Sequence, residues 1–334
     1  MLKIGIIGYG YWGPNLLRNL FATPNCGVES VADFRQERLN GIHKNYPSIK
    51  TTTDPNDILL SSKIDAVVIA TPVHTHYELG KKALENGKHV LLEKPVTSSS
   101  AQAAELINIA GKKGLLIMVD HTFLYTGAVQ KMKNLVQNGE IGKLQYLDST
   151  RINLGLFQPD INVLWDLAPH DISVLTFLNN EIPVSVNARG ISHTNNNVEN
   201  IAYMTLNYQS GFIAHFHCSW SSPVKIRMML MGGDKKMVVY NDMEPTEKIK
   251  VYETGYHVRN DEEKRSILVD YRVGDIFVPK LSTKEALTAM SEDFVNSILN
   301  KSQPLANVGI ALNVVKILEA AEHSIKNNGK EVKL

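Results

Sequence analysis

Three glycines near the N-terminus have the spacing of a turn that binds phosphates. Gly8, Gly10 and Gly13 form a G-x-G-x-x-G sequence after an apolar run, and Pro14 then opens a helix-like stretch. The first glycine of such a turn allows a tight bend, the second lets the backbone approach a pyrophosphate, and the third permits close helix packing. The N-terminus of the helix faces the phosphate charge. The pattern therefore predicts a dinucleotide site.

An acidic residue follows at the position that would meet the adenosine ribose. Asp33 stands twenty residues after Gly13, at the end of the second apolar run. A carboxylate there would accept hydrogen bonds from the ribose hydroxyls and repel a 2′-phosphate, which favours NAD over NADP. Arg35 leaves NADP open as the alternative, because a guanidinium at that place can stack on adenine or hold a 2′-phosphate.

A second pair of residues with chemically useful spacing lies in the middle of the chain. Asp166 and His170 are four residues apart in a segment with helical character, so their side chains share one helix face. A carboxylate beside an imidazole fixes its tautomer and raises its basicity, which suits a general base that takes a hydroxyl proton near neutral pH. The adjacent Asp171 is expected to be a structural carboxylate.

Strand and helix signals alternate over the first 120 residues and must position the glycine turn. Helix-like stretches such as Ser100–Lys113 separate a series of apolar runs. A repeated β-α-β pattern is typical of a doubly wound parallel sheet with helices on both faces. We therefore expect an N-terminal Rossmann domain over residues 1–122. The expected strands are Lys3–Ile7, Val28–Ala32, Ala66–Ala70, His89–Leu92 and Leu115–Val119.

The pattern changes from about Lys143, where alternating apolar segments separated by turn-like sequences begin. Such alternation predicts a largely antiparallel, open sheet with one covered face. We expect a C-terminal α+β domain over residues 123–334. The expected strands are Gln145–Arg151, Val184–Gly190, Ile201–Leu206, Phe212–Trp220, Met228–Met231 and Met237–Tyr240. The expected helices are Val163–Leu178, Leu287–Ile298 and Val308–Ile325.

Composition limits the classes of partner. The 35 basic and 34 acidic residues give a net charge of +1, which offers no electrostatic reason to expect nucleic acid or a membrane surface. The two cysteines, Cys26 and Cys218, lack disulfide or metal-ligand spacing, which favours a reducing cytoplasm. The apolar N-terminus is too short for a secretory signal. His215 and His217 alternate on an expected strand, but two ligands do not complete a zinc site, so no metal is expected.

Three further segments combine with the glycine turn into a specific order of motifs. They are Ala70-Thr71-Pro72 followed by His76, then Glu93-Lys94-Pro95, and then Asp166-Leu167-Ala168-Pro169-His170-Asp171. The chain thereby resembles the glucose–fructose oxidoreductase/inositol dehydrogenase family (Gfo/Idh/MocA) over essentially its whole length. The last segment matches the D-x-x-x-H-D sequence of that family, although many members have glycine where this chain has Ala168-Pro169. The resemblance implies a nicotinamide-dependent oxidoreductase.

The resemblance also implies the roles of individual residues. Lys94 would lie between nicotinamide and substrate after a cis Lys94–Pro95 bond, where its ammonium can stabilise a developing alkoxide. We expect His170 to be the base and Asp166 to orient it, with Lys94 as the alternative proton-transfer group. The residues expected to bind the cofactor are Gly8, Gly10, Tyr11, Trp12, Gly13, Asp33, Arg35, Thr71, Pro72, His76, Glu93 and Lys94. The residues expected to bind the substrate are Lys94, Tyr125, Arg151, Trp165, His170 and Arg227.

The substrate class is indicated by the segment Ser219–Arg227 and the later Tyr240-Asn241-Asp242. They are similar to a branch of the family associated with nucleotide-sugar and surface-polysaccharide pathways. Guanidinium groups match phosphate oxygens, and the cationic residues that could meet a diphosphate are Arg151, Lys225, Arg227 and Lys280. The leading expectation is hydride transfer at a secondary hydroxyl or ketone, at C3, of a UDP- or dTDP-linked sugar.

Other functions remain open from the sequence. A cyclitol or free-sugar dehydrogenase is the alternative within the family, and the direction of the reaction is not fixed by the residues. An NAD-dependent elimination and a nicotinamide-binding sensor without turnover are further alternatives. An exposed sheet face would require a cover, which predicts a homodimer or homotetramer.

Overall fold

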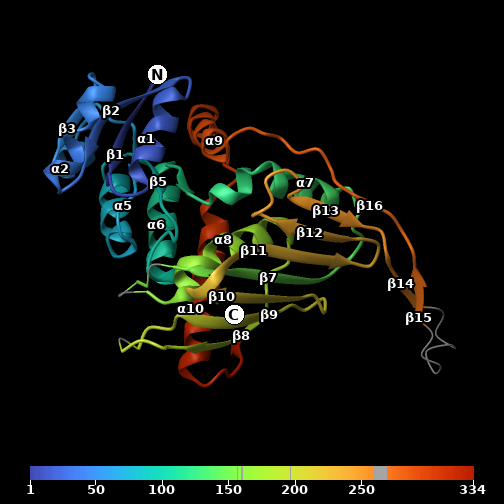
Figure 1. The fold of residues 1–334 in the computed structure, drawn as a ribbon. Helices are drawn as coiled ribbons and strands as arrows, with labels where there is room; N and C mark the ends of the chain where they lie inside the picture. Colours follow the sequence, from blue (N-terminus) through green and yellow to red (C-terminus); the bar gives the residue numbers. More distant parts are fainter. Residues whose placement is uncertain (156, 159–160, 196, 259–268) are drawn as a thin grey trace. The chain divides into compact units, whose positions relative to one another are not determined.

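The chain folds into two compact units. The computed structural model describes residues 1–155, 157–158, 161–195, 197–258 and 269–334 (Figure 1). Unit 1 consists of Met1–Thr126 and Lys284–Lys316, and unit 2 consists of Gly127–Thr283 and Ile317–Leu334. The domain boundary expected from the sequence placed all residues after 122 in the second domain. In the structure, helix α9 (Ala286–Asn300) and the first part of α10 (Val308–Lys326) belong instead to unit 1.

Unit 1 is built on a six-stranded parallel sheet with the order β3-β2-β1-β4-β5-β6. The central strands are almost wholly buried, as parallel strands covered on both faces must be. The strand order reverses between β1 and β4, and this reversal leaves a crevice at the carboxyl ends of the strands. The strands are β1 (Leu2–Ile7), β2 (Cys26–Ala32), β3 (Lys50–Thr52), β4 (Ala66–Ile69), β5 (His89–Leu92) and β6 (Ile117–Val119).

The helices of unit 1 pack on this sheet and on one another. Helix α1 packs against β1, β2 and α9, and α5 packs against β4, β5 and α6. Arg18 on α1 pairs with Glu285 at the start of α9, with Nη2 2.5 Å from the carboxylate. The helices are α1 (Gly13–Ala22), α2 (Gln36–Leu39), α3 (Ile42–Asn45), α4 (Asn56–Leu59), α5 (His76–Glu85) and α6 (Ser100–Lys113), with short 3₁₀ turns η1 (Val73–Thr75) and η2 (Thr122–Tyr125).

Unit 2 is built on a nine-stranded sheet with the order β16-β13-β12-β11-β7-β10-β9-β8-β17. Neighbouring strands are antiparallel except β7 and β10, which pair in parallel. The strands are β7 (Leu144–Leu154), β8 (Ser185–Ile191), β9 (Ile201–Asn207), β10 (Ile213–Ser219), β11 (Ser221–Gly233), β12 (Met237–Asn241), β13 (Ile249–Tyr252), β16 (Ile276–Phe277) and β17 (Val332–Lys333). A separate two-stranded ribbon is formed by β14 (Gly255–Val258) and β15 (Val269–Arg272).

One helix of unit 2 crosses the middle of its sheet. Helix α8 (Val163–Leu178) packs against β7, β9 and β10, and α7 (Gly127–Gln137) packs against α8. Burial alternates along β9 and β10, so one side of each strand faces the covered core. Near the end of α10, the Ser324 hydroxyl accepts a hydrogen bond from the backbone N–H of Ala188 on β8. Among the described residues, no helix is long and apolar enough to cross a membrane.

The predicted fold class is confirmed, with a Rossmann sheet at the N-terminus and a largely antiparallel sheet after it. The predicted helix Val163–Leu178 coincides with α8. The sequence missed the short strands β3, β13, β14, β15, β16 and β17, because two to four polar or mixed residues carry no clear alternation.

Candidate active site

The glycine turn between β1 and α1 is closed by backbone on two sides and open on a third. Gly8 has φ = 98°, and a Cβ there would lie 2.4 Å from the carbonyl oxygen of Ala70. A Cβ on Gly13 would lie 2.4 Å from the carbonyl oxygen of Gly8. A Cβ on Gly10 would have the Arg35 guanidinium, 3.7 Å away, as its nearest neighbour. The middle glycine therefore leaves room for a ligand to approach the backbone, as a pyrophosphate requires.

Asp33, directly after β2, is held by its neighbours in one orientation. Its Oδ2 accepts a hydrogen bond from the Tyr9 N–H (2.8 Å), and its Oδ1 accepts from the Arg35 N–H (3.0 Å) and Nε (3.1 Å). Burial raises the pKa of Asp33, but the hydrogen bonds from Arg35 and Tyr9 outweigh it, so the pKa is lowered overall. A carboxylate with a lowered pKa is ionised at neutral pH, as a ribose acceptor must be.

A cavity of about 950 Å³ opens at the carboxyl ends of β1, β2, β4 and β5 in unit 1. It is lined by every residue expected to bind the cofactor except Gly13 and His76. The cavity is of the size and shape class that small-molecule sites occupy. With the open Gly10 and the ionised Asp33, it fits a nicotinamide dinucleotide.

His76 lies behind this cavity. Its ring is buried, with Nδ1 2.9 Å from the carbonyl oxygen of Pro95 and Nε2 2.8 Å from that of Thr71. Burial lowers the pKa of His76, although the contacts with backbone carbonyls oppose this effect. The imidazole therefore connects the loop after β4 with the turn after β5, and its direct contact with the cofactor stays a prediction. The Lys94–Pro95 bond in that turn is cis.

Glu93 and Asp120 meet beside Lys94, and the sequence analysis missed Asp120. Asp120 accepts hydrogen bonds from the Trp12 indole N–H (2.7 Å, on Oδ2) and from the N–H and hydroxyl of Thr122 (on Oδ1). Glu93 Oε2 accepts from the Lys94 N–H (3.0 Å). Burial first, and the neighbouring Asp120 second, raise the pKa of Glu93 well above its usual value. Glu93 was selected as part of the Glu93-Lys94-Pro95 motif; Asp120 follows β6 as Glu93 follows β5, so its position at a strand end was the signal that could have found it.

His121, next to Asp120, is a buried imidazole. Neither ring nitrogen has a hydrogen-bond partner among the described residues. Burial and, secondarily, the charge of Lys94 lower the pKa of His121 to about 3. The side chain is therefore neutral at physiological pH.

In unit 2, helix α8 carries the predicted pair Asp166 and His170. The helix begins where the Asn162 side chain accepts hydrogen bonds from the first free backbone N–H groups, and it continues through Pro169. The two residues therefore keep the i,i+4 spacing on one helix face. Asp166 Oδ2 accepts a hydrogen bond from the Trp220 indole N–H (2.9 Å). This bond fixes the carboxylate that was expected to orient the imidazole.

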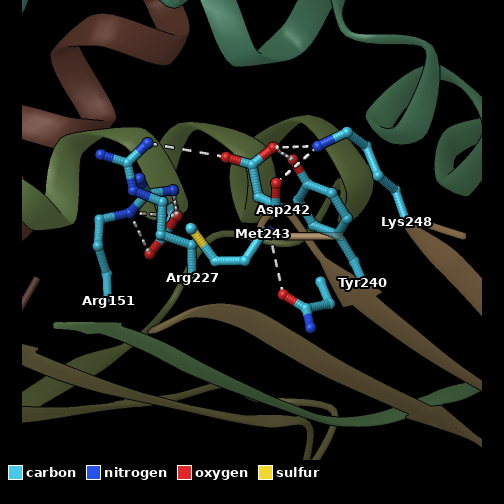
Figure 2. Close-up of polar contacts among 8 residues, drawn as sticks. Arg151, Arg227, Tyr240, Asp242, Met243 and Lys248 are labelled. Carbon is cyan, nitrogen blue, oxygen red and sulfur yellow. Dashed lines mark hydrogen bonds and ion pairs between the residues drawn. The ribbon is translucent and has the colours of Figure 1, made fainter. Parts of the chain in front are cut away.

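Arg151, which was expected to contact a diphosphate, forms an ion pair inside unit 2 (Figure 2). Its Nε and Nη2 donate to both oxygens of Asp171 at 2.5–3.0 Å, and the two side chains are 4% and 3% exposed. The Ser149 hydroxyl also donates to Asp171 (2.8 Å). Arg151 lies below the surface with its Nε and Nη2 bound to Asp171, and its contact with a substrate stays a prediction. Asp171 is the structural carboxylate that the sequence predicted.

Arg227 lies directly opposite Arg151 in the pairing of β11 with β7, and it forms a long ion pair with Asp242 (Figure 2). Its Nη1 is 3.8 Å from Asp242 Oδ2, and its side chain is 31% exposed. Asp242 also accepts hydrogen bonds from Lys248 Nζ (3.1 Å) and the Tyr240 hydroxyl (3.1 Å). Burial first, and the charge of Arg151 second, lower the pKa of Arg227. Its positive charge is therefore only partly compensated.

Two aromatic residues expected at the substrate are part of the packing. The Tyr125 hydroxyl donates to Asp293 (2.6 Å) and accepts from the Ala306 N–H (3.1 Å). The Trp165 indole donates to Glu322 (3.1 Å). Both side chains are buried and their polar groups make internal contacts, and their contact with a substrate stays a prediction. The remaining cations, Lys225 and Lys280, are exposed.

The histidines of β10 have an aromatic neighbour. The rings of His215 and His217 stack on Tyr203 of β9, with centroids 6.2 and 4.4 Å away. Among the described residues, no group of three or more His, Cys, Asp or Glu could hold a metal ion.

Comparison with known proteins shows the family. The family model described as "Oxidoreductase family, NAD-binding Rossmann fold" matches residues 2–121, and the "GFO/IDH/MocA C-terminal domain" matches residues 129–238. The chain belongs to the Gfo/Idh/MocA family of oxidoreductases, and its first unit is the NAD-binding Rossmann domain of that family.

Individual relatives extend this assignment to most of the chain. The "Uncharacterized oxidoreductase YdgJ" of Escherichia coli is 30% identical over 182 residues, which is 51% of each chain. The "UDP-N-acetylglucosamine 3-dehydrogenase" of Acidithiobacillus ferrooxidans is 27% identical over 302 residues, or 89% of this chain and 88% of the relative. A solved structure of the enzyme with that name, GnnA from the same organism, has a TM-score of 0.83 at 22% identity and covers 98% of both chains, which shows the shared fold.

Proposed function

We propose that this protein transfers a hydride between NAD and a secondary hydroxyl or ketone, at C3, of a UDP- or dTDP-linked sugar. The relative named UDP-N-acetylglucosamine 3-dehydrogenase supports the sugar and the carbon, since it matches nearly the whole chain. The ionised Asp33 supports NAD as the preferred cofactor. Arg35 already donates to Asp33, which leaves less of its guanidinium for a 2′-phosphate.

The chemical roles follow from the residue types. Lys94 donates a hydrogen bond to the reacting oxygen and stabilises its developing negative charge. His170 takes the hydroxyl proton during oxidation and returns it during reduction. Asp166, fixed by Trp220, orients the imidazole. NAD supplies the hydride acceptor when it is bound.

Arg227 is the observation that carries the nucleotide part of the proposal. Its guanidinium stands beside that of Arg151, and its counter-charge, Asp242, is 3.8 Å away and shared with Lys248. A diphosphate would supply the missing charge and acceptors for several N–H groups at once. A free sugar or cyclitol has no such group.

The experiment is a screen of UDP- and dTDP-sugars and their free sugars with NAD⁺, followed by the absorbance of the reduced cofactor. We expect a nucleotide sugar to bind better than its free sugar, because the nucleotide adds contacts remote from the reacting carbon. Arg227→Gln should raise KM for the nucleotide sugar about tenfold, as expected for a lost charge-assisted hydrogen bond. Lys333→Gln, an exposed cation on β17 at the edge of the same sheet, is the matched control. Equal affinity for both substrate forms would favour the cyclitol or free-sugar dehydrogenase instead.

We also propose that the protein is a homodimer or homotetramer. Large apolar side chains on the unit 2 sheet, among them Tyr203, Ile213 and Ile191, are about half exposed. A patch of this kind typically marks an interface. Light scattering after gel filtration tests it, and a monomer at micromolar concentration would contradict it.

A further inference from the structure

Two carboxyl groups are brought together where β5 and β6 end. Glu93 follows β5 and Asp120 follows β6, and the ladder pairs the preceding residues Leu92 and Val119. The Asp120 N–H donates to the Leu92 carbonyl at 2.7 Å, so the strands hold the two acids side by side. Asp120 is thus a charged neighbour of Glu93 and raises the pKa of Glu93, second to burial. Two carboxyl groups this close do not both ionise easily, because the second charge is repelled by the first.

The surroundings of the two acids are unequal. Asp120 accepts hydrogen bonds from the Trp12 indole and from both the N–H and the hydroxyl of Thr122. Glu93 accepts one on Oε2, from the Lys94 N–H. Its Oε1 is buried, and none of the described residues directs a donor at it. Hydrogen-bond donors stabilise an ionised carboxylate, whereas a buried carboxylate oxygen without a donor is unfavourable. The negative charge is therefore expected on Asp120 and the proton on Glu93.

We propose that Glu93 is a protonated carboxylic acid at neutral pH that donates to Asp120, and that the pair positions Lys94 and Trp12 at the cofactor cavity. The resulting series of hydrogen bonds runs from the Lys94 amide through Glu93 and Asp120 to the Trp12 indole. It connects the turn after β5 with the glycine turn. Lys94, Trp12 and Glu93 all line the cavity. Glu93 is thus a positioning residue, and the consequence for turnover rests on the proposed function of Lys94.

Loss of the proton that Glu93 shares with Asp120 would break this series of hydrogen bonds. Asp120 and Lys94 are the charged groups that face Glu93, and His121 nearby is kept neutral by burial. Deprotonation places a second negative charge against Asp120 and removes the donor between the two acids. The affinity for NAD should therefore fall at alkaline pH as Glu93 ionises, in keeping with its raised pKa.

The test uses three variants of the full chain. Glu93→Gln keeps a donor for Asp120 and an acceptor for Lys94 and does not ionise, whereas Glu93→Leu removes both. We expect Glu93→Leu to weaken NAD binding at pH 7 about tenfold, and Glu93→Gln to recover most of this loss and to lack the alkaline decline. Glu105→Gln, an exposed acid paired with Lys81 on α5, is the matched control.

Infrared spectroscopy of the folded protein supplies a readout that does not depend on a sugar substrate. The carbonyl band of a protonated carboxylic acid should be present at pH 7 in the native protein and in Glu105→Gln, and absent in Glu93→Gln. Its absence from the native protein, or an equal loss of NAD affinity in both Glu93 variants, would show that Glu93 is an ordinary carboxylate. Neither measurement requires turnover, so failure of the proposed sugar reaction would leave this result unaffected.

Discussion

Arg151 and Asp171 form a buried two-pronged ion pair that joins β7 to α8. Nε lies 2.9–3.0 Å and Nη2 2.5 Å from the carboxylate, and the side chains are 4% and 3% exposed. Asp171 is the next residue after His170. The pair therefore fixes, from inside the unit, the helix on which His170 and Asp166 stand.

Removal of Arg151 alone should destabilise the fold, because it leaves the charge of Asp171 buried without a partner. Arg151→Met leaves the Asp171 charge without its counter-charge, and loss of one member of a buried pair typically destabilises by about 3–5 kcal/mol. Denaturant unfolding measures this change. The double variant Arg151→Met/Asp171→Leu is the control and should recover a large part of the loss, because it leaves no isolated charge. A change below about 1 kcal/mol in the single variant would contradict a tightly buried pair.

The second prediction concerns the chemical step. Lys94→Ala and His170→Ala should each lower kcat and kcat/KM together by about 10²–10⁴-fold, the usual contribution of a general acid or base. The double variant should lose less than the product of the single losses, because both groups serve one proton transfer. Steady-state kinetics with separate NAD titrations check this. Near-native kcat in His170→Ala with an inactive Lys94→Ala would make the lysine the base.

Variants that disturb Asp166 should lower kcat less than removal of His170 does. Trp220→Phe removes the indole N–H that holds Asp166 Oδ2 but keeps most of the ring volume. We expect a loss of kcat about tenfold, smaller than that of His170→Ala, because the imidazole stays in place while its orienting group loosens. Asp166→Asn should also lose less than His170→Ala. If Trp220→Phe were as inactive as His170→Ala, loss of packing would be the better explanation, and thermal unfolding of the same variant would show it.

The third prediction concerns cofactor choice. NAD should bind more tightly than NADP, and Asp33→Ser should narrow the difference because it removes the charge that repels a 2′-phosphate. Isothermal titration with both cofactors measures the two affinities. Arg35→Gln is the companion variant, since it leaves Asp33 in place and removes the guanidinium bound to it. Tighter NADP binding by the native protein would show that Arg35 dominates.

The fourth prediction follows from the buried, neutral His121. Its pKa of about 3 in the folded protein lies below the ordinary 6.5, so the folded state binds fewer protons than the unfolded chain between these values. Its contribution to stability is complete above pH 6.5 and declines as the pH falls towards 3, with a slope of up to about 1.4 kcal/mol per pH unit. His121→Phe should flatten this part of the stability curve.

Urea unfolding of both proteins from pH 7.5 to 4.5 checks this difference. At neutral pH His121→Phe should change stability little, because neither ring nitrogen has a partner to lose among the described residues. An unchanged acid slope in the variant would show that other groups govern acid unfolding.

The cofactor half of the site could be predicted because its determinants are local. Gly8, Gly10 and Gly13 lie in one turn, Asp33 lies at the end of an expected strand, and Glu93 belongs to the short motif Glu93-Lys94-Pro95. Asp120 was missed although it directly follows the expected strand Leu115–Val119, because no motif marked it.

Arg151 shows why the substrate half was harder to predict. The alternation along β7 does not show on which face of the sheet the Arg151 side chain lies. Its ion-pair partner, Asp171, lies on a helix and twenty residues later in the sequence. Tyr125 and Trp165 are used by Asp293 and Glu322, which are more than 150 residues away in sequence. A sequence pattern shows which side chains can bind a ligand, but it does not show which of them tertiary packing has already engaged.

The return of Lys284–Lys316 to unit 1 has a consequence for biosynthesis. Helix α9 packs on α1 through Arg18 and Glu285, and a hydrogen bond joins Thr288 to Asn19. A ribosome must therefore translate the whole of Gly127–Thr283 before the first unit receives its last helix. Domains ordinarily complete themselves from the N-terminus during translation. In this chain the nucleotide-binding unit starts first but is completed only after the main part of unit 2 has been translated, so its nascent form exposes the α1 surface for most of its synthesis.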